Sequence, residues 1–228
     1  MSRTLGGAVV ALTLAASAIG GEISDPSNRF RLTTPEGWTN ETPPFAAIAL
    51  VTVSPRRAET GGNCNVVVTV TNETKGLTQA ELEAQLTGKF DEAFWKAALG
   101  NVKQIKSTTI DNWGERTQRG RKVFFVKATS EVEVPGVSLV VTQLLDLHPT
   151  PGTVFAVTCT ALAAGFAREE KDFETVMTSF EPLPDMTVAA FRAPGNLGAV
   201  RAVVAKASGD AAWAGVARVA NRGRPMAQ

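Results

Sequence analysis

The sequence has very little of the chemistry on which most enzymes and metal sites depend. Its 228 residues include one histidine, His148, and two cysteines, Cys64 and Cys159. A Ser/His/Asp triad needs an imidazole held between a carboxylate and a hydroxyl, and a zinc site needs several closely spaced ligands. His148 precedes a proline turn at the end of a predicted strand, which is typical of a solvated loop histidine. Most histidine-based catalysis and the usual zinc patterns are therefore excluded.

A charge excess of one sign and a phosphate-binding loop are also missing. The 23 basic and 22 acidic residues nearly cancel, which argues against a nucleic-acid-binding protein. The chain has no Walker loop, and the glycines at Gly195 and Gly198 lack the preceding strand of a dinucleotide fingerprint. A glycosidase needs two carboxylates, but Glu131 and Glu133 alternate along a predicted strand as a solvated face does. We expect no cofactor and no metal, and an enzyme is the least favoured function class.

The first 18 residues have the parts of an export signal in the right order. A positive start at residues 1–3 precedes an apolar run over 5–16 and the small residues of Ala-Ser-Ala at 16–18. That run is too short to span a bilayer comfortably, and no later run is long and uncharged enough. We predict a signal peptide over residues 1–18 and a product in the periplasm or outside the cell. The alternative is an ordinary N-terminal helix of a cytoplasmic protein.

The two cysteines fit an oxidising compartment, which favours their pairing. Cys64 opens a predicted strand over 64–71, and Cys159 lies near the end of another over 153–160. A disulfide would tie two strands of one sheet, or its rim, and closing a loop of about 100 residues stabilises by about 4–5 kcal/mol in the chain-entropy model. Two buried free thiols are the alternative. A redox dithiol is disfavoured because there is no Cys-x-x-Cys.

Hydrophobic periodicity predicts one α+β domain over residues 22–184. Apolar or alternating runs indicate strands at 29–33, 45–53 and 64–71, followed by four more joined by tight turns between 106 and 160. The segment 54–63, with proline, arginine and glycine, indicates a surface loop. We expect a mainly antiparallel twisted sheet of about six or seven strands with helices packed on its faces.

Two helices are predicted from apolar spacings of three and four residues. The first runs continuously over 78–100, from a capping box at Thr78 and Glu81 to a stop at Gly100. The second covers 167–180, has acidic residues in its first turn, and presents an apolar face. That face consists of Phe173, Val176, Met177 and Phe180.

The remaining segment, 185–228, is rich in alanine and has a net positive charge, whereas the preceding domain is net negative. We predict a largely disordered tail, with a marginal helix over 197–207 as the alternative. Such a tail would dock weakly on the acidic domain or on an anionic lipid surface.

A polar, cationic segment over 113–122 offers the best local candidate for binding. It contains Trp113, Arg116, Arg119 and Arg121 on a predicted hairpin tip, and exposed tryptophan and arginine are common interface anchors. This hairpin tip would bind an anionic partner. The alternative is a charged edge that prevents sheet-to-sheet aggregation.

Several strings resemble the PsbP-like superfamily, which includes bacterial DcrB-like proteins and mycobacterial LpqN-like lipoproteins. The entry over 30–38 (FRLTTPEGW) and the later run over 154–160 (VFAVTCT), followed by Phe173 and the segment 177–180, are similar to that family in this order. The resemblance covers about residues 30–183. It implies an α/β/α sandwich and binding or accessory proteins without shared catalytic residues. The lipobox cysteine of the lipoprotein members is absent, and the basic tail is not part of the family core.

Three functions follow in order of preference. The first is an exported, non-catalytic accessory protein that binds an unknown envelope protein. The second is a carrier of a small molecule or lipid, in a pocket between sheet and helix. The third is a carboxylate-based enzyme. A complete filling of the interior by Phe90, Phe94, Trp95, Phe173 and Phe180 would argue against the carrier.

Overall fold

A computed structural model describes residues 20–44, 46–134 and 137–183 of the chain. The predicted signal peptide over 1–18 and the predicted tail over 185–228 lie outside these residues. All described helices and strands fall between Glu22 and Pro182.

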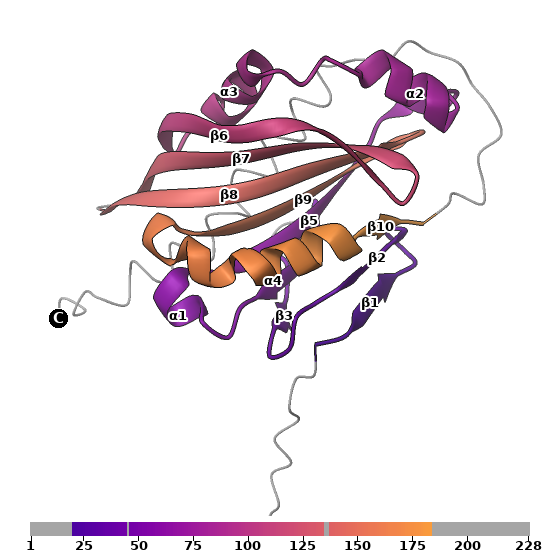
Figure 1. Ribbon diagram of the computed structural model, residues 1–228. Helices are drawn as coiled ribbons and strands as arrows, with labels where there is room; N and C mark the ends of the chain where they lie inside the picture. Colours follow the sequence, from indigo (N-terminus) through magenta and orange to yellow (C-terminus); the bar gives the residue numbers. More distant parts are fainter. Residues whose placement is uncertain (1–19, 45, 135–136, 184–228) are drawn as a thin grey trace, which may run out of the picture.

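The centre of the structure is a sheet of seven strands in the order β3-β4-β5-β9-β8-β7-β6, shown in Figure 1. Its strands are β3 (Thr39–Glu41), β4 (Ile48–Val53), β5 (Asn63–Val70), β6 (Ile105–Gln118), β7 (Arg121–Val134), β8 (Val137–Thr150) and β9 (Thr153–Leu162). A smaller sheet joins β1 (Glu22–Asp25), β2 (Phe30–Thr33) and β10 (Glu181–Pro182). All strand pairs among the described residues are antiparallel, so the predicted mainly antiparallel α+β fold is confirmed.

Helices cover both faces of the main sheet. Helices α2 (Gln79–Leu86) and α3 (Glu92–Gly100) lie on one face, and α4 (Phe166–Ser179) lies on the other with the small sheet (Figure 1). The described residues also form a short helix α1 (Arg57–Thr60) and two 3₁₀ turns, η1 (Asn72–Thr74) and η2 (Ala163–Gly165). This arrangement is the predicted three-layer sandwich.

The predicted continuous helix over 78–100 is wrong, because the chain turns between α2 and α3. The capping box at Thr78 and Glu81 forms as expected and starts α2. Gly88 then takes a left-handed φ of 70°, which ends the helical path, and the Asp91 side chain accepts a hydrogen bond from the Phe94 backbone N–H at 2.7 Å. Asp91 thus caps a new helix. The apolar spacing continues across the turn, so periodicity alone does not reveal the break.

Aromatic side chains fill the interior on both faces of the sheet. On the α2/α3 face, Phe90, Phe94 and Trp95 are at most 3 % exposed and pack in one core with residues of strands β4 to β9. On the α4 face, Phe173 and Phe180 are at most 1 % exposed and pack against β5, β9 and the small sheet. The five aromatic residues thus occupy the two cores.

The segment 54–63 is not the predicted surface loop, because it encloses a buried carboxylate of α4. Glu169 is 0 % exposed and accepts hydrogen bonds from Ser54 Oγ at 3.0 Å and from Thr60 Oγ1 at 2.6 Å. Arg56 Nη2 lies 2.9 Å from the other Glu169 oxygen. Gly62 leaves room for this carboxylate, since a Cβ there would lie 2.8 Å from its carbon. Such hydrogen bonds and ion pairs offset the loss of hydration that a buried carboxylate suffers.

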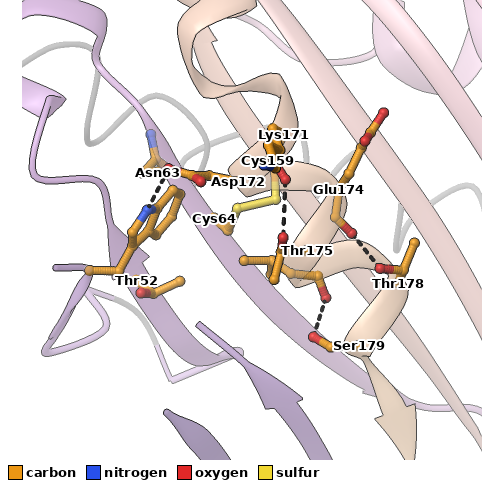
Figure 2. Close-up of a disulfide and its surroundings, with 12 residues drawn as sticks. Thr52, Asn63, Cys64, Cys159, Lys171, Asp172, Glu174, Thr175, Thr178 and Ser179 are labelled. Carbon is orange, nitrogen blue, oxygen red and sulfur yellow. Dashed lines mark hydrogen bonds between the residues drawn. A yellow bond between two sulfur atoms is a disulfide. The ribbon is translucent and has the colours of Figure 1, made fainter. Parts of the chain in front are cut away.

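The disulfide between Cys64 and Cys159 is present, as predicted, and joins directly opposed residues of the neighbouring strands β5 and β9. Both cysteines face α4 and belong to the core beneath it, and Figure 2 shows the bond beside this helix. The bond closes a loop with a sequence separation of 95 residues. It therefore restricts the unfolded chain strongly.

Replacing both cysteines, in Cys64→Ala/Cys159→Ala, should lower the free energy of unfolding by about 4 kcal/mol. Urea denaturation of the oxidised protein and of the double variant measures the difference. The reduced wild-type protein is the matched control and should resemble the variant. A difference below about 1 kcal/mol would contradict the expected restriction of the unfolded chain.

Candidate functional site

A groove of about 650 Å³ lies between α4 and the outer strands β6, β7 and β8. We call it the α4 groove. Its apolar surface comes from Phe125, Leu144 and Met177. Polar and charged side chains surround this surface, including Asn112, Arg116, Lys127, Glu170, Lys171, Glu174, Thr175 and Thr178. An apolar surface with polar groups at its margin is typical of a ligand site.

Strand alternation explains which side chains reach this groove. In β6, Asn112 and Arg116 lie opposite Lys127 and Val123 of β7, so they share the face that α4 covers. In β8, Asp146 lies opposite Phe125 and also faces α4. Alternate side chains of three neighbouring strands therefore line the groove.

An ion pair with a buried carboxylate lies at one end of the α4 groove. Asp146 is 2 % exposed, and Arg116 Nη2 donates a hydrogen bond to its Oδ2. The Arg116 guanidinium also lies 5.2 Å from the centre of the Phe125 ring. Burial raises the pKa of Asp146 to about 6, although Arg116 acts against this rise. Arg116 thus stabilises the buried carboxylate and forms part of the groove wall.

His148 is buried, so the prediction of a solvated loop histidine is wrong. Strand β8 continues through Pro149 to Thr150, which keeps His148 inside the sheet. Its ring centre lies 4.6 Å from that of Phe180, and its Nε2, 4.0 Å from Asp146 Oδ2, has no hydrogen-bond partner. Burial lowers the pKa of His148 to about 3, helped by the charges of Arg116 and Arg121. The imidazole is therefore neutral at physiological pH.

A second, smaller hollow of about 190 Å³ lies at the tip of the β6–β7 hairpin. We call it the tip recess. It is lined by Gln118, Arg119, Arg121 and Lys122 of the hairpin, by His148 and Pro149 of β8, and by Phe180, Glu181 and Pro182 after α4. The turn itself is only Arg119 and Gly120, both with positive φ, which suits a two-residue hairpin.

The four predicted binding residues do not form one surface. Trp113 is 42 % exposed but lies opposite Val126, on the α2/α3 face of the sheet. Arg116 and Arg121 lie on the α4 face, and Arg119 lies in the turn. The hairpin turn has only two residues, so the predicted tip over 113–122 consists mostly of paired strand. Of the four predicted residues, Arg119 and Arg121 line the tip recess, and Arg116 lines the α4 groove. Their role in partner binding remains a prediction.

The acidic pair considered for glycoside chemistry is solvated, as expected. Glu131 and Glu133 are exposed on β7, where Glu131 accepts a hydrogen bond from Ser138 and Glu133 pairs with Lys106. Within the described ranges, no group of three or more histidine, cysteine or acidic side chains is placed to hold a metal ion. No helix of the described residues has the length and apolar character needed to cross a bilayer.

Sequence reasoning missed the acidic residues that organise this face. Asp146 and Glu169 are both buried, yet acidic residues are usually exposed and neither stands in a recognisable motif.

Sequence reasoning also missed the structural role of Gln118. Its Nε2 donates to the carbonyl oxygens of Met177 at 3.1 Å and Phe180 at 3.0 Å, so it fastens the hairpin to the end of α4.

No family model and no curated protein sequence matches this chain. Among solved structures, it is similar to cyanobacterial PsbP (CyanoP) from Synechocystis sp. PCC 6803, with a TM-score of 0.50 and 16% identity over 79% of this chain and 98% of that chain. The Ran-binding protein Mog1p of Saccharomyces cerevisiae gives a TM-score of 0.44 and 14% identity over 72% and 95% of the two chains. LpqN of Mycobacterium tuberculosis, described as involved in cell envelope biogenesis, gives a TM-score of 0.41 and 15% identity over 68% of this chain and 83% of that chain. At such identities the likeness to CyanoP shows the fold alone, and the predicted PsbP-like fold is confirmed.

The neutral state of His148 predicts a distinct NMR titration. As the only histidine of the chain, it gives one set of imidazole signals, which should not titrate between about pH 5 and 8. A titration step near the ordinary histidine pKa would contradict the burial described above.

The lowered pKa of His148 also predicts how the free energy of unfolding depends on pH. Between the ordinary histidine pKa and about pH 3, the unfolded chain binds a proton that the folded chain does not, so His148 lowers stability as pH falls. Asp146 acts in the opposite direction at and below about pH 6, because its pKa is raised. Compared with His148→Phe, the wild type should therefore lose roughly 1 kcal/mol per pH unit below about pH 6. Urea denaturation of both proteins at several pH values, with about pH 7.5 as the reference, measures the difference in their free energies of unfolding. A difference that stays constant with pH would contradict the lowered pKa of His148.

Proposed function

We propose that this chain is a non-catalytic binding protein that receives its partner or ligand in the α4 groove. The observation that carries this proposal is the groove itself. Its volume of about 650 Å³ lies within the roughly 300–1,000 Å³ typical of ligand sites, and it combines an apolar surface with charged margins. Such a surface suits an amphipathic segment of a partner protein or a small amphiphile.

The occupied interior favours an open groove over an enclosed carrier cavity. Phe90, Phe94 and Trp95 pack in one core, and Phe173 and Phe180 pack in the other. The groove lies outside these cores, at the exposed side of α4 around Thr175 and Glu174. A lipid carried within the domain is therefore the less favoured alternative, and a ligand on the groove surface remains compatible with the proposal.

The state of the acidic groups supports a binding role. Asp146 is held by Arg116, and His148, the only imidazole, is buried without a hydrogen bond to a hydroxyl. Glu169 is enclosed by Ser54, Thr60 and Arg56. Both buried carboxylates thus have polar partners, and the buried imidazole makes no hydrogen bond to a hydroxyl that it could activate.

We further propose that the protein is exported to the periplasm or secreted. The disulfide supports this, because such bonds persist in oxidising compartments, and the apolar run over residues 5–16 supports it independently. The mature protein, isolated from its own host, should begin at Ile19 in N-terminal sequencing. A mature protein that retains Met1 would contradict export by signal cleavage.

Filling the α4 groove should weaken partner binding. Thr175 is an exposed residue of α4 that lines the groove, so Thr175→Trp places a large side chain in it. The matched control is Ala167→Trp, which adds the same side chain at an exposed position of α4 outside the groove. Affinity capture from an envelope extract, quantified by mass spectrometry, compares these variants with the wild type.

The expected result is a component retained by the wild type and by Ala167→Trp but reduced at least about tenfold by Thr175→Trp. Both variants should keep the wild-type circular dichroism spectrum. The same retained components in all three proteins would contradict the assignment of the groove as the binding site.

A further inference from the structure

We propose that the tip recess is a second binding site, which takes an oxyanion group, the carboxylate or phosphate of a ligand. Two cationic side chains, those of Arg119 and Arg121, line it against the single carboxylate of Glu181. Lys122 borders the recess, but its ammonium group binds Glu115 and Thr87 on the opposite face of the sheet. The recess lies at the hairpin end of the sheet and does not share its lining residues with the α4 groove. This inference therefore goes beyond the proposed function and does not depend on it.

The positive charge of the recess is not fully neutralised by its neighbours. Glu181 accepts hydrogen bonds from Arg31 Nη2 at 2.8 Å and from Arg119, so one carboxylate faces two guanidinium groups. Lys122 Nζ lies 3.0 Å from Glu115 Oε2. Arg121 has no ion-pair partner among the residues that the structure describes. One guanidinium group at the recess thus lacks a counter-charge.

Arginine is well suited to bind an oxyanion in such a place. Its guanidinium group is planar, stays charged, and donates two parallel hydrogen bonds to a carboxylate or phosphate. The charge of Arg121 also acts on the recess wall, because it contributes to the lowered pKa of His148. A bound anion would supply the missing counter-charge.

The walls of the recess strengthen this interaction. Phe180, Pro149 and Pro182 provide apolar surface, and the neutral His148 ring packs against Phe180. A less polar surrounding lowers the effective dielectric constant, so a charge pair formed there gains more than on open surface. The volume of about 190 Å³ lies below the range of drug-sized sites, which fits one charged group rather than a whole ligand.

The recess is also preorganised. The two hydrogen bonds from Gln118 to the carbonyl groups of Met177 and Phe180 hold the hairpin against the end of α4. Arg119 adds a contact to the same region through Glu181. Because these contacts fix both walls before binding, little conformational freedom is lost when an anion enters.

The single histidine provides a direct test. His148 lines the recess, and its imidazole signals report on a charge that binds beside it. Untagged protein is titrated with inorganic phosphate in one series and with acetate in another, with sodium chloride at matched ionic strength as the reference. The variants are Arg121→Gln and Arg121→Lys, and the control is Lys103→Gln, an exposed cation beyond the opposite end of β6.

The expected result is a saturating shift of the His148 signals with at least one oxyanion but not with chloride, in the wild type and in Lys103→Gln. The anion with the lower dissociation constant identifies the preferred chemistry, phosphate or carboxylate. Arg121→Gln should bind at least about tenfold more weakly, and Arg121→Lys should fall between the two because it keeps the charge but loses the planar fork. Since the Arg121 side chain makes no ion pair in the described chain, both variants should fold, which circular dichroism checks.

Two outcomes would overturn the inference. The first is a linear or absent response to both oxyanions that matches the chloride reference. The second is an unchanged dissociation constant in folded Arg121→Gln, which would show that the anion binds elsewhere.

Discussion

Helix α4 is fastened to the rest of the domain near both of its ends by polar contacts, and the surface we assign to binding depends on this attachment. Near its start, Glu169 accepts hydrogen bonds from Ser54 and Thr60 in the segment that includes α1. At its end, the carbonyl groups of Met177 and Phe180 accept hydrogen bonds from Gln118 of β6. Between these attachments the apolar face of the helix packs on the sheet, while its outer side borders the α4 groove.

The two hollows on this face are adjacent along one strand. Asp146 lines the α4 groove and His148, two residues later in β8, lines the tip recess. The groove offers apolar surface with mixed charges, whereas the recess offers excess positive charge. Together they would suit an elongated amphipathic ligand with an acidic end, which connects our two independent proposals without making either depend on the other.

Much of the fold was predictable because its elements follow hydrophobic periodicity. The alternation and β-branched composition of the strands, the apolar face of α4 and the pairing of Cys64 with Cys159 all follow from local pattern or compartment. The break between α2 and α3 was not predictable from spacing, because apolar residues recur at helical intervals on both sides of Gly88. Only the N-capping role of Asp91 marks the new helix start.

The candidate site was less predictable because it depends on register and burial. Trp113 and Arg116 are close in sequence, yet an odd separation along β6 places them on opposite faces of the sheet. Asp146 and Glu169 are buried through contacts with residues far away in the chain, and composition gives no sign of that. For His148 the following proline suggested a turn, although β8 in fact continues to Thr150.

Site-specific photocrosslinking in producing cells tests the central claim, that the α4 groove receives the binding partner, most directly. A photoreactive residue is placed at Thr175 or Asn112, on the two walls of the groove, and at Ala167 on the same helix outside it. We predict the same discrete adduct, identified by mass spectrometry, from positions 175 and 112, and none from 167. An adduct from position 167 alone, or no adduct from either groove position, would contradict the account.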